Sequence, residues 1–313
     1  MLSKITPPKH LFFPIILALI VVNLLCLSVL LRWRLRWSKI HAVNTQAISK
    51  LDRYQHPQIP IVSAPSDISL TATSFILIDN NTNTTLISKN PDQKIFPAST
   101  TKLATALTAL NIYPLDELIT IKEKYDVGKV MNLVPEEKIT VKSLVTALLV
   151  YSANDAAYSL ANHHQAGVGG FVNQMNLIVS KYGLKNTHFA NYDGIDDPEN
   201  YSSVYDLAQI GRISIKNPVI REVVRNKAIT VTDISGSIKH ELISTNELLG
   251  LSPEIEGLKT GWTPEAGGSF VGLINRNGHY LISVVANSTD RFSDTQKIVD
   301  WAKENVVWND YLF

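Results

Sequence analysis

The chain has 313 residues, of which 45% are hydrophobic, and this length allows a membrane anchor together with one large domain or two smaller ones. Its 29 Lys and Arg residues are balanced by 28 Asp and Glu residues, so the formal net charge of +1 argues against a nucleic-acid-binding protein and against an acidic tail. The only cysteine, Cys26, leaves no partner for a disulfide within the chain.

Residues 11–31 form an apolar run that follows a short N-terminal tail over residues 1–10. At about 1.5 Å per helical residue, this run is long enough to cross a bilayer core of about 30 Å. A cleavable signal peptide has a shorter apolar region followed by small residues, whereas positions 32–37 here hold three Arg, two Trp and one Leu. We therefore expect a transmembrane helix, with Trp33 and Trp37 at the level of the headgroups.

The next segment, residues 32–71, mixes polar residues with prolines and shows no sustained period, so we expect a juxtamembrane linker. A helix over residues 41–54 is an equally good reading of the same stretch. Two short β-rich runs follow, over residues 74–79 and 84–88, and the Asn-rich stretch between them predicts a hairpin.

Residues 97–110 predict a helix, because apolar residues recur at helical spacing and Pro97 suits a first turn. Ser99 is then expected in that first turn, and Lys102 lies three residues on, on the same face. A serine hydroxyl becomes a good nucleophile when a nearby base takes its proton, and a lysine does so only when its amine is neutral. Burial and a second cation both favour the neutral amine. A Ser-x-x-Lys pair alone is more often a helix cap with a solvated lysine.

Further helices are expected over residues 140–150, 155–164, 171–182 and 203–215, the last with a capping box at Ser203 and Asp206 and a stop at Pro218. Ser152 and Asn154 fall at the joint between the first two of these helices. A hydroxyl and an amide at such a joint can be directed into a cleft, although helix capping is the simpler reading.

Five strands are expected after this helical block, over residues 228–234, 237–244, 258–263, 269–274 and 280–286, and a final helix over residues 294–305. This order of elements predicts an antiparallel sheet flanked by helices, with an all-helical part inserted. Lys259, Thr260 and Gly261 lie on a predicted edge strand. A lysine beside a hydroxyl can hold a carboxylate, and a glycine lets a substrate backbone approach the strand.

Together, the Ser99–Lys102 pair, the Ser152–Asn154 joint and the Lys259–Gly261 strand make the chain resemble the low-molecular-weight penicillin-binding proteins. Within this group it is similar to the D-alanyl-D-alanine carboxypeptidases, a family of penicillin-recognising serine enzymes. The resemblance covers about residues 72–307 and extends to the stretches 151–157, 186–189, 205–208 and 257–267. It implies an α/β (α+β) fold of the β-lactamase/transpeptidase type and a serine DD-peptidase catalytic domain over residues 72–313.

The resemblance also implies the chemistry of the site. Ser99 is the expected nucleophile, which forms an acyl-enzyme with the penultimate D-alanine, and Lys102 is its general base. Ser152 relays a proton to the departing D-alanine, and Asn154 orients Lys102 and the substrate amide. The backbone N–H groups of Ser99 and Trp262 form the oxyanion hole.

Substrate binding is expected on the strand that carries Lys259 and at the last helix. Lys259 keeps the site electropositive, and Thr260 with Arg291 holds the terminal carboxylate of the substrate. Gly261 leaves room for the substrate backbone. The expected partners are peptidoglycan stem peptides and, as covalent inhibitors, β-lactams. No cofactor or metal is expected, because the histidines lack the spacing of metal ligands.

Three alternatives remain open. A β-lactamase shares the same residues but needs a further base for rapid deacylation, and Glu199 lies in a suitable loop. A DD-endopeptidase would use the same residues on a cross-linked peptide. A catalytically idle wall-binding module is disfavoured, because the expected nucleophile and base are both present.

The expected location is the bacterial cell membrane, with a single span and the catalytic domain on the extracytoplasmic side. The flanking charges oppose this orientation, because four basic residues over positions 32–39 outnumber those of the N-terminal tail. Long domains are translocated largely regardless of such charges, and the expected function decides the assignment.

Overall fold

The computed structural model describes residue 17 and residues 20–36, 58–63 and 67–309. The chain is divided into two compact units, Met1–Pro57 and Gln58–Phe313. In the first unit, residues 20–36 form a helix whose apolar side chains are exposed. No helix among the described residues is both long and apolar enough for a membrane span. Residues 11–16 and 18–19 of the expected span lie outside the described residues, as does the alternative helix over 41–54.

A five-stranded antiparallel sheet, in the order β3-β2-β10-β9-β8, forms the centre of the second unit. Its strands are β2 (Ser74–Asp79), β3 (Thr85–Lys89), β8 (Ile255–Thr263), β9 (Gly267–Arg276) and β10 (His279–Ser288). The predicted hairpin is β2–β3, and the Asp79 carboxylate accepts the backbone N–H groups of Asn81 and Thr82 in its turn. Strand β10, from the C-terminal part of the unit, pairs with β2, from its N-terminal part. The sheet therefore joins segments that are far apart in the sequence.

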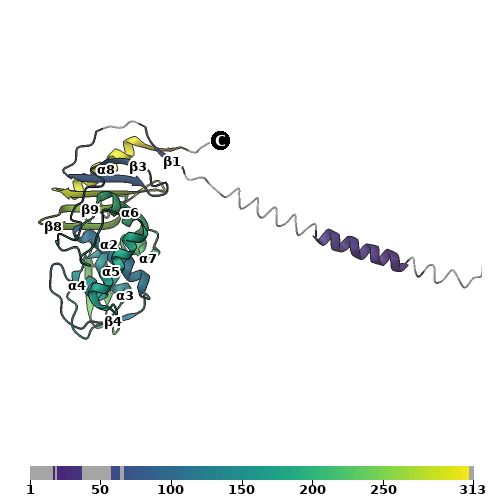
Figure 1. The fold of residues 1–313 in the computed structure, drawn as a ribbon, viewed down its shortest axis with the longest axis horizontal. Coiled ribbons are helices and arrows are strands. Elements are labelled where there is room, and N and C mark those ends of the chain that lie inside the picture. Colours follow the sequence, from purple (N-terminus) through teal and green to yellow (C-terminus); the bar gives the residue numbers. More distant parts are fainter. Residues whose placement is uncertain (1–16, 18–19, 37–57, 64–66, 310–313) are drawn as a thin grey trace, which may run out of the picture. The chain divides into compact units, whose positions relative to one another are not determined.

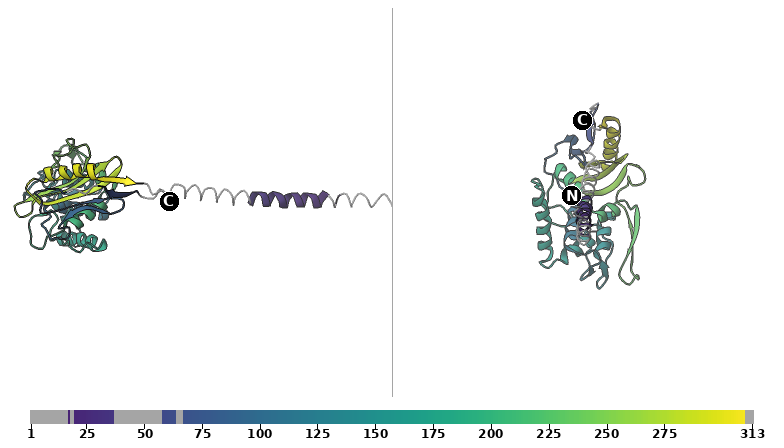
Figure 2. Two further views of the ribbon diagram at one scale, coloured as in Figure 1. Left: turned by 90° about the horizontal axis from the view of Figure 1, so that it is seen from above. Right: turned by 90° about the vertical axis from the view of Figure 1, so that its right-hand side faces the viewer.

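Both faces of this sheet are buried, as the alternation of side chains along β2 shows. Phe75 and Leu77 belong to a cluster with Ile298 and Trp301 of α8 (Arg291–Asn305). The intervening apolar residues of β2 belong instead to the larger core that contains the other helices. Figures 1 and 2 accordingly show α8 on one face of the sheet and the helical subdomain on the opposite face.

The helical subdomain and the helices beside it follow the predicted order. They are η2 (Ala98–Thr101), α2 (Lys102–Ile112), α3 (Val141–Val150), α4 (Asn154–Asn162), α5 (Gly167–Lys181), α6 (Val204–Ser214) and α7 (Pro218–Val223). Side-chain caps define two of the predicted starts: Thr140 accepts the Ser143 N–H at 3.1 Å, and Ser203 accepts the Asp206 N–H at 3.1 Å. The expected antiparallel sheet with flanking helices and a helical part is therefore confirmed.

Pro218 does not end the helical structure, as the sequence suggested, but begins α7. The Asn217 side chain accepts the N–H groups of Val219 and Ile220, and a proline at the first helical position loses no intrahelical hydrogen bond. Helix α6 has already ended at Ser214, so Pro218 lies in the next helix and does not terminate the first.

Three two-stranded sheets complete the described part of the unit. The predicted pair β6 (Ala228–Thr232) and β7 (Lys239–Ile243) is present, and β4 (Leu118–Thr120) pairs with β5 (Lys138–Thr140). Strand β1 (Ile59–Val62) lies within the range expected to be a linker and pairs with β11 (Val306–Asn309). Because its partner lies at the other end of the chain, no local pattern indicated this strand.

Candidate active site

Ser99 and Lys102 stand on two consecutive helical segments. Ser99 lies in the 3₁₀ turn η2, not in the first turn of an α-helix as expected, and Lys102 is the first residue of α2. Ala98 has a positive φ of 48°, and Thr100 N donates to Pro97 O at 3.2 Å, so the chain tightens into 3₁₀ geometry before α2 begins. The three-residue spacing still brings Lys102 Nζ to 3.0 Å from Ser99 Oγ.

Lys102 has no solvent exposure, whereas Ser99 is half-buried. The Nζ atom of Lys102 also donates to the backbone oxygen of Asp193 at 2.6 Å. Burial lowers the pKa of Lys102 to about 8, although the Asp193 carboxylate acts in the opposite direction. At neutral pH a fraction of about one tenth of the amine is therefore uncharged, which is enough for it to act as a base.

Ser152 and Asn154 occupy the joint between α3 and α4, as predicted. Ser152 is buried and has a φ of 68°, in the left-handed region where a non-glycine residue is strained. The Asn154 backbone N–H donates to Lys129 O at 2.7 Å, and its side-chain Nδ2 donates to Val127 O at 3.0 Å. Asn154 thus binds the loop over residues 122–130. A Cβ on Gly128 would lie 2.4 Å from Asn154 Nδ2, so only glycine permits this approach.

Strand β8 passes directly beside Ser99. A Cβ on Gly261 would lie 3.0 Å from the backbone nitrogen of Ser99 and 3.0 Å from Ala98 Cβ. Lys259, two residues earlier, is buried and donates to Thr260 O at 3.0 Å. Burial lowers the pKa of Lys259 well below its ordinary value, and the charges of Lys102, Lys129 and Arg291 add to this effect. The structure therefore brings the first and third sequence elements together around Ser99.

The remaining predicted residues lie on β8 and at the start of α8. Thr260 Oγ1 donates to Thr245 Oγ1 at 2.7 Å. Arg291 Nε is buried and has no hydrogen-bond partner within the described part of the chain. Burial also lowers the pKa of Arg291. Trp262 is 61% exposed, so its side chain lies largely in solvent.

Asp193 and Gly194 are parts of the site that the sequence reasoning missed. A Cβ on Gly194 would lie 1.8 Å from Ala98 O, and this glycine has a φ of 85°. The loop can therefore press against the turn that carries Ser99 and present Asp193 O to Lys102. An Asp-Gly dipeptide indicates a turn, and this was the available signal. What the turn packs against follows only from the tertiary structure.

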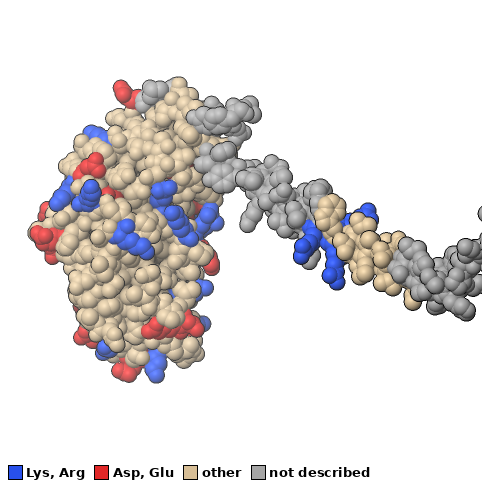
Figure 3. All heavy atoms as spheres, turned by 45° about the vertical axis from the view of Figure 1, so that its right-hand side comes forward, with Lys and Arg blue, Asp and Glu red and all other residues tan. Residues whose placement is uncertain are grey.

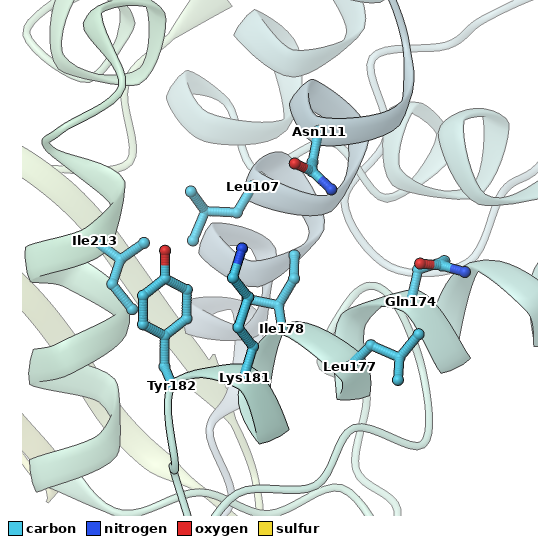
Figure 4. A pocket seen from close by; sticks show the side chains of 8 residues that line it. All are labelled: Leu107, Asn111, Gln174, Leu177, Ile178, Lys181, Tyr182 and Ile213. Carbon is cyan, nitrogen blue, oxygen red and sulfur yellow. The ribbon is translucent and has the colours of Figure 1, made fainter.

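Other surface features of the described residues lie away from this site. Figure 3 shows Lys and Arg side chains interspersed with Asp and Glu side chains on one face of the molecule, in keeping with the balanced net charge. A groove of about 180 Å³ between α2, α5 and α6 is lined by Leu107, Tyr182 and Ile213 among others, and contains none of the predicted site residues (Figure 4). Within the described ranges, no group of three or more His, Cys, Asp or Glu residues could hold a metal ion.

Both the sequence and the fold of this chain are similar to those of known proteins. Residues 61–290 match a family model described as D-alanyl-D-alanine carboxypeptidase. A D-alanyl-D-alanine carboxypeptidase of Streptomyces sp. (strain K15) is 33% identical over 289 residues, which cover 86% of this chain and 98% of that protein. The carboxypeptidase DacA of Haemophilus influenzae is 32% identical over 252 residues, covering 75% of this chain and 63% of its own length.

The solved structure of the Streptomyces K15 DD-transpeptidase superposes with a TM-score of 0.73 at 33% identity. The superposition covers 77% of this chain and 100% of that one. The second unit therefore has the α+β fold of the penicillin-binding DD-peptidases, as the sequence resemblance implied.

Proposed function

Because the chain belongs to the D-alanyl-D-alanine carboxypeptidase family of serine hydrolases, we propose that it removes the terminal D-alanine from peptidoglycan stem peptides through an acyl-enzyme on Ser99. The observation that carries this proposal is the 3.0 Å contact between Lys102 Nζ and Ser99 Oγ in a buried site. A lysine whose pKa is lowered to about 8 is a competent base for a serine hydroxyl.

In the first half of the reaction, neutral Lys102 takes the Ser99 proton as Oγ attacks the carbonyl carbon of the penultimate D-alanine. The negative charge on the carbonyl oxygen is met by the backbone N–H groups of Ser99 and Trp262, an arrangement worth about 3 kcal/mol per donor. Ser152 passes its proton to the nitrogen of the departing D-alanine as the C–N bond breaks and takes a proton from Lys102 in its place, so the lysine is neutral again. Asn154 positions the substrate amide and holds the adjoining loop.

In the second half, neutral Lys102 takes a proton from the water that attacks the ester carbon, and this proton passes to Ser99 Oγ as the ester C–O bond breaks and the shortened peptide leaves. Lys259, Thr260 and Arg291 are assigned to the terminal carboxylate of the substrate. Arg291 Nε, which has no hydrogen-bond partner among the described residues, and the buried amine of Lys259 support this assignment, because a nearby anion stabilises the charged form of both. Gly261 leaves space for the substrate backbone beside β8.

The same residues would react with a β-lactam, whose ring amide takes the place of the D-alanyl-D-alanine bond. We also assign residues 11–31 to a single membrane anchor that holds the catalytic domain over residues 72–313 on the extracytoplasmic side. The support is the length and apolarity of the run in the sequence, together with the location of peptidoglycan outside the cytoplasmic membrane.

A second candidate reaction is transfer of the acyl group to an amine instead of water, supported by the similarity to the protein named DD-transpeptidase. Incubation of the purified full chain with a pentapeptide stem, with and without an amine acceptor, separates the candidates. Free D-alanine with a tetrapeptide product supports the carboxypeptidase, and a peptide joined to the acceptor supports the transpeptidase.

The same preparation is then labelled with a fluorescent penicillin. A Ser99 adduct that is lost rapidly indicates a β-lactamase, and cleavage of a cross-linked peptide dimer indicates an endopeptidase. The absence of both adduct and product would refute the assignment and leave the idle wall-binding module.

A further inference from the structure

A buried carboxylate lies beside the lysine that has to be neutral for the proposed reaction. Asp193 is 2% exposed, and its backbone oxygen accepts from Lys102 Nζ at 2.6 Å. Its carboxylate raises the pKa of Lys102 against the effect of burial. Were this carboxylate to bond Nζ directly, the ion pair would stabilise the charged amine and remove the base.

The Asp193 carboxylate instead accepts hydrogen bonds from groups other than Lys102. Tyr125 Oη donates to Asp193 Oδ2 at 3.1 Å, and the Ile195 N–H donates to Asp193 Oδ1 at 3.3 Å. Both carboxylate oxygens therefore have a donor that is not Lys102, and the lysine meets only the backbone oxygen of the same residue. Burial raises the pKa of Tyr125, so its hydroxyl remains a proton donor at neutral pH.

Tyr125 is itself held in place by aromatic contacts. Its ring stacks on Tyr158 with centroids 4.7 Å apart at 17°, and meets Tyr192 at 6.5 Å and 63°. The Tyr158 hydroxyl donates in turn to the Glu123 carboxylate. The loop that carries Tyr125 is also fixed by the two hydrogen bonds from Asn154 to its backbone.

We propose that Tyr125 is a positioning residue, whose hydroxyl keeps the Asp193 carboxylate out of ion-pair contact with Lys102 and so preserves the lysine as a base. The inference rests on the proposed function. Among the described residues, Lys102 interacts electrostatically with Lys259 of β8, and Tyr125 interacts with Tyr158, Tyr192 and Asp155 as well as with Asp193. Of these groups, the Asp193 carboxylate is the one that raises the pKa of Lys102 and so opposes the neutral amine.

Tyr125→Phe tests the proposal, because it keeps the stacked ring and removes only the hydroxyl. The rate of acylation by a fluorescent penicillin is measured against pH. We expect the acid limb of the profile to move to higher pH by about half to one unit, with a fall of about three- to tenfold at pH 7 and an unchanged plateau at high pH. Tyr158→Phe is the matched control, since that hydroxyl bonds Glu123 and not Asp193, and we expect no shift.

A double variant identifies the cause. Without a carboxylate at position 193 there is nothing to restrain, so Tyr125→Phe should have no further effect in an Asp193→Asn background. An equal rate loss at every pH, an unshifted limb, or the same loss in that background would each overturn the proposal.

Titration of the Lys102 methylene next to Nζ by ¹³C NMR reads the protonation state without a substrate. A higher lysine pKa in Tyr125→Phe is expected, and an unchanged value would refute the role of Tyr125 even if the proposed function held. Conversely, if the wild type released no D-alanine but Tyr125→Phe still raised the pKa of Lys102, the proposed function would be refuted and the positioning role would stand.

Discussion

Lys102 Nζ lies 3.0 Å from Ser99 Oγ and 2.6 Å from the backbone oxygen of Asp193, so the lysine connects Ser99 to a loop about ninety residues away in the chain. The first contact follows from local helical spacing, and the second depends on the tertiary fold. Lys102 is fully buried between these two contacts. Its pKa therefore depends strongly on the charged and polar groups around it.

Ser99→Ala should abolish both penicillin labelling and D-alanine release, because the variant lacks the attacking oxygen. Ser99 is half-buried and bonds only Lys102 among the contacts described, so we expect the free energy of unfolding to change by about 0.5 kcal/mol or less. Gel labelling, a D-alanine assay and urea unfolding check the two expectations. Continued release of D-alanine from the variant would mean that another residue is the nucleophile.

Lys102→Ala should slow acylation by about 10²- to 10⁴-fold, the range expected for loss of a general base. Lys142→Ala, at an exposed position of α3, removes a similar charge outside the site and should leave the rate unchanged. Stopped-flow measurement of penicillin acylation distinguishes the two. If the Lys102→Ala rate recovered fully at high pH, another group would be the base.

The acylation rate of the wild type should rise with pH through about 8, the value to which burial lowers the Lys102 pKa. The neutral fraction of the amine is about one tenth at pH 7 and about nine tenths at pH 9, so we expect an increase of about tenfold. The folded pKa is below the unfolded value, so burial of this lysine destabilises the fold less as pH rises through this range. A rate that fell between pH 7 and 9 would contradict a neutral lysine base.

The part of the site that depends on local spacing was predictable, and the part that depends on packing was not. Ser99, Lys102 and the β8 residues carry short patterns whose chemistry can be read from residue types. Asp193 acts through a backbone oxygen, which any residue has, so no residue type could indicate that contact. Tyr125 lies in a polar loop, and its partner follows only from the fold.

The same distinction applies to the fold. Strands β8, β9 and β10 alternate or run apolar over many residues and pair with near neighbours, so their pattern identified them. Strand β1 has four residues and pairs with β11 at the far end of the chain, so nothing nearby in the sequence indicated it. The turn η2 was expected as α-helix, because the sequence gives no sign of the positive φ at Ala98.

His240→Ala should lower the free energy of unfolding by about 3 kcal/mol. His240 and Glu137 form a buried pair with 2.8 Å between Nε2 and Oε1, and His240 Nδ1 lies 3.0 Å from Met131 O. Removing one partner leaves a carboxylate buried without its counter-charge. His188→Ala, where the ring is exposed and lies against Glu199 O, is the control and should change stability by about 0.5 kcal/mol or less.

The pH dependence of this pair has a definite sign. Glu137 raises the pKa of His240, so the charged imidazole is favoured in the folded state. Its contribution to stability is complete below the unfolded pKa of about 6.5 and is lost as pH rises through the higher folded value. Urea unfolding between pH 6 and 9 should show this loss in the wild type and not in His240→Ala. Parallel curves for both proteins would show that the pair does not titrate in this range.

Gly261→Ala should impair acylation at least tenfold, because the added Cβ would lie 3.0 Å from the Ser99 backbone nitrogen and from Ala98 Cβ. That distance is too short for two carbon atoms, so either β8 or the turn carrying Ser99 has to move. A shift of this kind misaligns the Ser99 N–H of the oxyanion hole and costs about 1–3 kcal/mol of stability. Gly169→Ala in α5 is the matched control, because its Cβ meets nothing within 4 Å and alanine favours a helix. Acylation at the wild-type rate in Gly261→Ala would mean that β8 does not define the geometry around Ser99.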